Sequence, residues 1–103
     1  MSTIYDYIDE MRARPGMFTQ DKSLGPLETL LYGYCACLQS NEIKEYYEGR
    51  QFHPREFSAW LFDEMGWFGA LGFASAIESN TSSPERAFLT FFKLVERFRQ
   101  SEA

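Results

Sequence analysis

Valine and isoleucine are scarce in this sequence of 103 residues. Val95 is the only valine, and the isoleucines are Ile4, Ile8, Ile43 and Ile77. Branching at Cβ favours strands, whereas the leucine, phenylalanine, methionine and alanine that supply the remaining apolar side chains are compatible with helices. Hydrophobic residues make up 45% of the chain, which is enough for a packed core. We therefore predict an all-α fold, a single compact bundle of about five helices, formed as one domain over residues 1–103.

The residues that bind metals or attack substrates are equally few. The chain has two cysteines, Cys35 and Cys37, and one histidine, His53. Two positions apart on a helix, the cysteines point in different directions and cannot form a disulfide with each other. A metal site needs more ligands than these. His53 precedes Pro54 at an expected helix start, so we interpret it as a structural residue. We expect no metal, no cofactor and no catalytic residue.

The sequence also lacks an excess of positive charge and a long hydrophobic run. Its formal net charge is −5, so it should bind neither nucleic acid nor an anionic membrane. The most apolar stretch, residues 67–76, is far shorter than the roughly 18 residues of a membrane span. No signal-peptide pattern is visible at the N-terminus. These features predict a cytoplasmic protein.

Apolar residues recur at helical spacing along the chain. Thr3 and Asp6 form the pattern of a capping box, and Pro15-Gly16 should end the first helix. The last helix should carry a wide apolar stripe and lie at the centre of the core. The expected helices are Ile4–Ala13, Pro26–Ser40, Pro54–Gly66, Trp67–Ser79 and one from Pro84. A further short helix is expected over Glu42–Glu48, capped by Gly49. The residues expected to point inward are Trp67, Leu71, Ala74 and Ile77 on the fourth of these helices and Ala87, Phe88, Phe91, Phe92, Val95 and Phe98 on the last.

Tyrosines and carboxylates are concentrated in the first part of the chain. All six tyrosines precede residue 48, and the stretch up to Glu78 contains twelve carboxylates but only six basic residues. Tyrosine offers a large rigid contact area with a polar tip, and carboxylates accept hydrogen bonds from arginine and lysine. This mixture is typical of a surface that binds a basic partner, although a solvated acidic face would have the same composition. The candidate partner-binding residues are Glu45, Tyr46, Tyr47 and Glu48, followed by Asp6, Asp9, Asp63 and Glu64.

The two adjacent tyrosines of this candidate site should differ in their surroundings. A buried tyrosine hydroxyl usually needs a hydrogen-bond partner, so Tyr46 and Tyr47 beside three glutamates are not expected to be buried together. We expect one of them to pack inward and the other to remain exposed.

Short motifs lie along most of the chain, mainly at helical positions and in the turn after the first helix. They are Tyr7-Ile8, Arg14-Pro15-Gly16-Met17-Phe18, Leu27-x-x-Leu30-Leu31-x-Gly33-Tyr34, Phe57-x-x-Trp60-Leu61, Gly66-Trp67 and Glu85-x-Ala87-Phe88-x-x-Phe91-Phe92-x-Leu94-Val95-x-x-Phe98. In this order they resemble a family of short bacterial proteins that accompany polymorphic and contact-dependent-inhibition toxins.

The resemblance implies a small helical immunity protein that binds and neutralises a cognate toxin domain, commonly a nuclease such as an RNase. It transfers no binding residue, because immunity surfaces differ between cognate pairs. The acidic, tyrosine-rich composition fits this function independently, since nuclease clefts are basic. The alternative is a small intracellular adaptor that self-associates. Its helices would pack against each other through a face that carries the small residues Gly33 and Ala36. An enzyme is the least favoured class.

Overall fold

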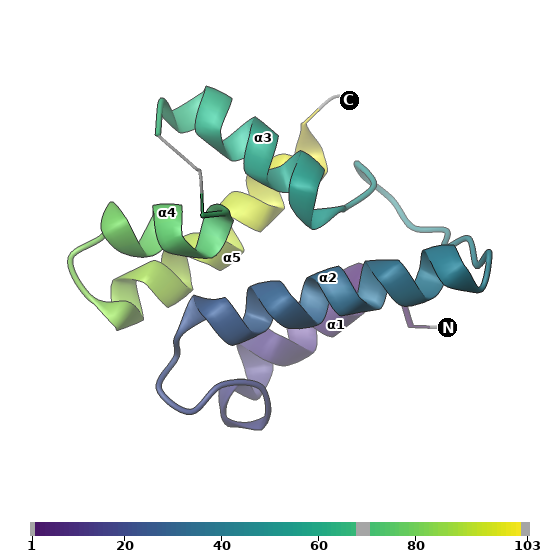
Figure 1. The fold of residues 1–103 in the computed structure, drawn as a ribbon, viewed down its shortest axis with the longest axis horizontal. Helices are drawn as coiled ribbons and strands as arrows, with labels where there is room; N and C mark the ends of the chain where they lie inside the picture. Colours follow the sequence, from purple (N-terminus) through teal and green to yellow (C-terminus); the bar gives the residue numbers. More distant parts are fainter. Residues whose placement is uncertain (1, 68–70, 102–103) are drawn as a thin grey trace.

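The computed structural model describes residues 2–67 and 71–101, and over these residues it contains helices and no strand. This part of the chain contains five α-helices joined by loops (Figure 1), which confirms the predicted all-α bundle. The elements are α1 (Ile4–Ala13), the 3-10 turn η1 (Pro15–Met17), α2 (Leu24–Ser40), α3 (Pro54–Met65), α4 (Phe73–Ser79) and α5 (Pro84–Gln100).

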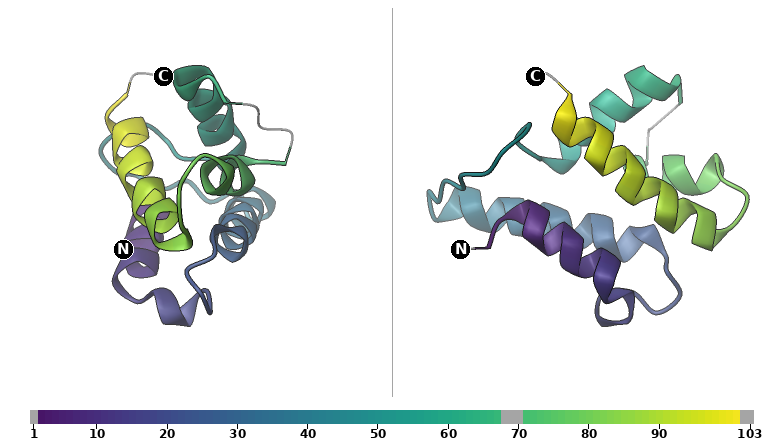
Figure 2. Two further views of the ribbon diagram at one scale, coloured as in Figure 1. Left: turned by 90° about the vertical axis from the view of Figure 1, so that its left-hand side faces the viewer. Right: turned by 180° about the vertical axis from the view of Figure 1, so that it is seen from behind.

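Helix α4 is short, but it packs against α2, α3 and α5. Helix α5 packs on α3 and α4 and contributes seven buried side chains, including all six of its predicted apolar stripe. Helix α1 lies along α5, since Tyr5 faces Arg99 at one end and Arg12 faces Phe92 at the other (Figure 2). The stripe on the last helix is thus confirmed, while the middle of the bundle is shared between α4 and α5.

Aromatic rings fill the core. Phe57 of α3 has no exposed surface. Its ring contacts five others at centroid distances between 5.2 and 6.0 Å, mostly edge to face, an arrangement that aromatic quadrupoles favour. The five rings belong to Phe52, Trp60, Phe73, Phe91 and Phe98.

The ends of α1 follow the sequence prediction. The Thr3 backbone N–H donates to Asp6 Oδ2 at 2.8 Å, and the Asp6 N–H donates to Thr3 Oγ1 at 3.4 Å. Both interactions of the capping box are therefore present. Pro15 cannot continue the helix and begins the turn η1, which directs the chain toward α2.

Helices α2 and α4 each supply the cap of the other. Glu78 of α4 accepts from the Leu24 backbone N–H at 3.2 Å, and Glu28 of α2 accepts from the Phe73 N–H at 3.1 Å. Helix N-termini carry unpaired N–H groups, and a carboxylate stabilises them by hydrogen bonding and by charge. The first cap explains why α2 begins at Leu24, whereas proline at N1 predicted a start at Pro26.

The predicted start of the fourth helix at Trp67 is wrong. Helix α4 begins only at Phe73, because Gly72 has a φ of +94° that is incompatible with a helix. Ala74 and Ile77 are buried as expected, and Trp67 packs against the core from outside any helix. Leu71, by contrast, is 79% exposed. Part of the predicted segment, residues 68–70, lies outside the described residues.

The short helix predicted over residues 42–48 is also absent, and residues 43–47 have no regular secondary structure. Glu42 has a φ of +53°, which ends the helical conformation directly after α2. The side chains that follow contact α1, α2 and α5. A separate finding is that no described helix is both long and apolar enough to cross a membrane.

Candidate functional site

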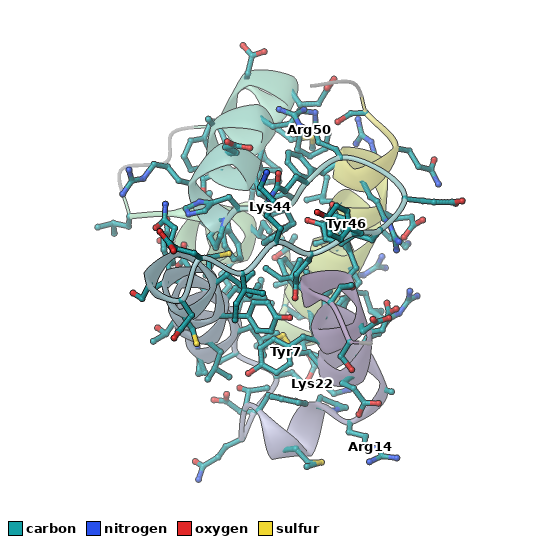
Figure 3. All side chains as sticks on the ribbon, turned by 90° about the vertical axis from the view of Figure 1, so that its right-hand side faces the viewer. Tyr7, Arg14, Lys22, Lys44, Tyr46 and Arg50 are labelled. Atoms are coloured by element: carbon teal, nitrogen blue, oxygen red, sulfur yellow. The ribbon has the colours of Figure 1, made fainter. Side chains whose placement is uncertain are left out.

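A segment without regular secondary structure, residues 42–52, crosses one face of the bundle between α2 and α3. We call it the strap. Figure 3 shows the strap passing over this face, with Lys44, Tyr46 and Arg50 among its side chains. The strap contains the four leading candidate residues, Glu45 to Glu48. Its contacts show which of them are available to a partner.

Glu45 attaches the strap to two helices. Its Oε1 accepts from the Ile4 backbone N–H at 2.9 Å, and its other oxygen accepts from the Tyr34 hydroxyl. Ile4 is the first residue of α1, so Glu45 satisfies one of the free N–H groups of that helix. Both oxygens of this half-buried carboxylate are therefore engaged within the protein. The structure assigns Glu45 a structural role.

Tyr47 points inward and Tyr46 points outward, as expected of the pair. The Tyr47 ring lies edge to face on Tyr5 at 4.9 Å, and its hydroxyl accepts from the Phe52 N–H at 3.2 Å. Tyr46 is 85% exposed. Tyr46 therefore presents an exposed ring between two neighbours that are anchored to the bundle.

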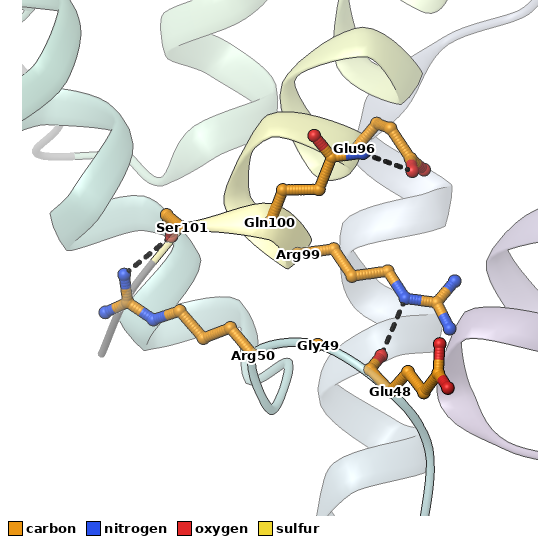
Figure 4. A pocket seen from close by; sticks show the side chains of 7 residues that line it. All are labelled: Glu48, Gly49, Arg50, Glu96, Arg99, Gln100 and Ser101. Atoms are coloured by element: carbon orange, nitrogen blue, oxygen red, sulfur yellow. Dashed lines mark hydrogen bonds between the residues drawn. The ribbon is translucent and has the colours of Figure 1, made fainter.

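The far side of the strap is attached to the C-terminal end of α5 (Figure 4). Arg99 Nε donates to the Glu48 carbonyl at 3.0 Å, and the Arg50 N–H donates to the Arg99 carbonyl at 2.8 Å. The Arg99 guanidinium also lies 4.3 Å from the centroid of the Tyr5 ring, a favourable cation–π distance. The Gly49 φ of +98° lets the backbone approach this closely. Tyr46 is thus fixed from both sides, and the Glu48 carboxylate remains exposed.

The structure brings some of the remaining candidate residues to the strap and places others far from it. Asp6 lies in the first turn of α1, the end that Glu45 caps, and Asp9 is exposed one turn further along. Asp63 and Glu64 are exposed at the C-terminal end of α3. The strap leads into the other end of that helix, about 14 Å away at 1.5 Å per residue. Asp63 and Glu64 therefore lie at the end of α3 opposite to the strap.

A cavity of about 430 Å³ lies behind the strap, between it, the C-terminal half of α2 and the first turn of α3. The sequence did not indicate this feature, because its lining combines three segments that no spacing pattern connects. Glu56 of α3 is the clearest residue that sequence reasoning missed. It lines the same cavity as Glu42 and Glu45.

Cys35 and His53 also line this cavity, but they do not form a nucleophile and base pair. His53 Nδ1 accepts from the Arg55 N–H at 3.1 Å, which makes His53 the N-cap of α3 as predicted. Burial, and then the charge of Glu45, raise the pKa of the Cys35 thiol to about 11. A thiol with such a pKa is protonated near neutral pH and is a weak nucleophile.

Comparison with known proteins provides no further assignment: no family model, no curated protein and no solved structure matches this chain. The fold and the candidate site define a small helical protein in which an anchored loop presents one exposed tyrosine beside carboxylates.

We expect the stability of the protein to fall steeply at alkaline pH because of Tyr5. Burial, and then the neighbouring Tyr47, raise the Tyr5 pKa far above its ordinary value of 10.0. The unfolded chain therefore loses this proton first, and as pH rises above about 10 Tyr5 alone lowers the free energy of unfolding by up to about 1.4 kcal/mol per pH unit. Burial also raises the pKa values of Tyr34 and Tyr47, which add to the decline. Urea unfolding between about pH 8 and 11 measures this slope.

The Tyr5→Phe variant is the control for the alkaline effect. It loses the hydrogen bond from the Tyr5 hydroxyl to the Arg50 carbonyl, so its stability should be lower at neutral pH. Its decline above about pH 10 should nevertheless be shallower than that of the parent, because one of the ionising groups is gone. Parallel declines in the two proteins would contradict the assignment to Tyr5.

Proposed function

We propose that this chain is an immunity protein that binds a nuclease toxin, of the RNase class, and covers its basic active-site cleft with the strap. The observation that carries the proposal is the 85% exposure of Tyr46 between residues that are anchored on both sides. An exposed tyrosine on a backbone that is held on both sides is the type of residue that dominates binding energy in protein interfaces, since the backbone loses little entropy when the ring is buried.

Charge supports the same partner. The Glu48 carboxylate is exposed beside Tyr46, Asp6 lies in the turn of α1 that the strap caps, and the whole chain carries a formal charge of −5. An acidic surface of this kind attracts a cleft that has evolved to hold phosphates. The family resemblance of the helical positions points to the same class of partner. We expect a complex that buries about 1,600 Å² in total and forms quickly at low salt.

The test uses the double variant Tyr46→Ala/Glu48→Gln and the toxin domain encoded by the neighbouring gene. The parent should inhibit cleavage of a labelled RNA by that domain and should restore growth when the two are co-expressed. Loss of a tyrosine anchor should weaken binding by about 2 kcal/mol or more, roughly thirtyfold, as measured by calorimetry. The melting temperature of the variant should remain near that of the parent, because neither side chain supports the fold.

A matched control carries the same two kinds of change on another surface. Leu89→Ala/Glu85→Gln truncates an exposed apolar side chain and neutralises one carboxylate on α5, more than two turns away from the end that holds the strap. This control should inhibit as well as the parent. Equal inhibition by all three proteins would place the interface elsewhere, and a failure of the parent to bind the neighbouring domain would overturn the proposal.

The second candidate function is self-association through α2. Ala36 is exposed, and a methyl group added at Gly33 would meet no atom within 4 Å. This face of α2 is therefore open to a helix from another molecule. Light scattering across a range of protein concentrations distinguishes the two functions: a stable dimer that Gly33→Leu disrupts supports the adaptor, and a monomer rejects it.

A further inference from the structure

The cavity behind the strap is lined by both apolar and acidic residues. Leu38, Ile43 and Phe52 are apolar, and Glu42, Glu45 and Glu56 are acidic. Its volume of about 430 Å³ is in the range of cavities that hold small ligands or single large side chains. Such a lining excludes anions and suits a group with an apolar stem and a cationic head.

The carboxylates differ in how free they are to bind. Glu45 is engaged by Ile4 and Tyr34, so it contributes charge but no free oxygen. Glu42 and Glu56 are exposed, and within residues 2–67 and 71–101 neither of them belongs to an ion pair. Lys44 is the single basic side chain of permanent charge in the lining, so negative charge prevails.

A metal ion is a poor match for these groups. No set of three or more histidine, cysteine, aspartate or glutamate side chains in the described part of the chain is placed to hold one. Divalent ions need several oxygen ligands close together, whereas these carboxylates surround a wide space with apolar walls. The site therefore suits an organic cation.

We propose that this cavity receives an arginine side chain of the partner protein, an inference that rests on the function proposed above. The aliphatic part of the arginine packs against Leu38, Ile43 and Phe52, and the guanidinium bonds to Glu42 and Glu56. Arginine fits better than lysine, because its planar group can bond to two separate carboxylates and is more weakly hydrated. Arginine is also a residue that nuclease clefts present, since it recognises phosphate.

The direct test does not need the toxin. Capped arginine, as N-acetyl-arginine-N-methylamide, is titrated into the ¹⁵N-labelled protein and followed by the shifts of backbone amides. We expect millimolar binding that moves amides of the strap, the end of α2 and the start of α3. Capped citrulline has nearly the same shape without the charge, and it should shift these amides far less.

The Glu42→Gln/Glu56→Gln variant tests the two carboxylates. Both side chains are exposed, so the fold should be retained, and the affinity for capped arginine should fall about three- to tenfold. Glu10→Gln/Glu85→Gln removes the same charge elsewhere and should bind like the parent. Equal shifts with arginine and citrulline, shifts confined to another surface, or unchanged affinity in the Glu42/Glu56 variant would each overturn the inference.

The toxin titration separates this inference from the proposed function. If Tyr46→Ala/Glu48→Gln weakens the complex while Glu42→Gln/Glu56→Gln does not, the proposed function stands and the partner arginine is rejected. If capped arginine binds but the toxin domain does not, the cavity site stands and the proposed function falls. Concentration-dependent shifts of the same amides without any ligand would assign the cavity to a second copy of this chain and reject the partner protein.

Discussion

Replacing Phe57 with alanine is expected to lower the free energy of unfolding by about 3–5 kcal/mol. Phe57 has no exposed surface, and its ring contacts rings from α3, α4, α5 and the strap. Truncation removes the buried apolar area and leaves a cavity that rigid neighbouring rings cannot close. In a domain of this size, with a total stability of about 5–15 kcal/mol, such a loss is severe.

Chemical denaturation of the Phe57→Ala protein measures the loss, with Leu89→Ala as control. Leu89 is 54% exposed on α5, so its truncation should change the stability by less than about 0.5 kcal/mol. If Phe57→Ala unfolds during expression, Phe57→Leu provides a milder test with a smaller loss in the same direction. A change below about 1 kcal/mol in Phe57→Ala would show that this ring does not organise the core.

Alanine substitutions at Gly72 and Gly33 are expected to change stability in opposite directions. Gly72 has a φ of +94°, and a methyl group there would lie 2.3 Å from Glu28 Oε2. The substitution therefore strains the backbone and displaces the carboxylate that caps α4, at a combined cost of about 2–4 kcal/mol. At Gly33 a methyl group meets no neighbour, and alanine is the better helix former by about 1 kcal/mol.

Thermal unfolding of the two variants provides the comparison. Gly72→Ala should melt about 10 °C or more below the parent, and Gly33→Ala a few degrees above it. Restoring space by adding Glu28→Ala to Gly72→Ala should not recover the loss, because the cap is then missing as well. A Gly72→Ala protein as stable as the parent would show that α4 does not depend on this turn.

The candidate residues of the strap divide into two roles, and this division affects how binding data are interpreted. Glu45 and Tyr47 hold the strap against α1, while Tyr46 and Glu48 extend away from it. Replacing all four together would lower stability and binding at once, and the two effects could not be separated. Substitutions at Tyr46 and Glu48 report on binding, and substitutions at Glu45 and Tyr47 report on how firmly the strap is held.

Local patterns in the sequence were sufficient to predict the all-α fold and most helix boundaries. The bounds of α1, the start of α3 and the stripe of α5 depend on capping residues, prolines and apolar spacing, all of which act within a few residues. The pairing of one inward and one outward tyrosine could also be expected, because a buried hydroxyl needs a partner. These predictions succeeded because the interactions responsible connect neighbours along the chain.

Only the tertiary structure decided the features that connect distant segments. The start of α2 depends on Glu78, the conformation of the strap depends on Ile4, Tyr34 and Arg99, and the cavity unites the strap with α2 and α3. The sequence by itself determined that the protein is helical, acidic and rich in tyrosine at its beginning. Which of those side chains remain exposed depends on contacts between separate segments, including hydrogen bonds between residues more than 40 positions apart, whose partners no local pattern indicates.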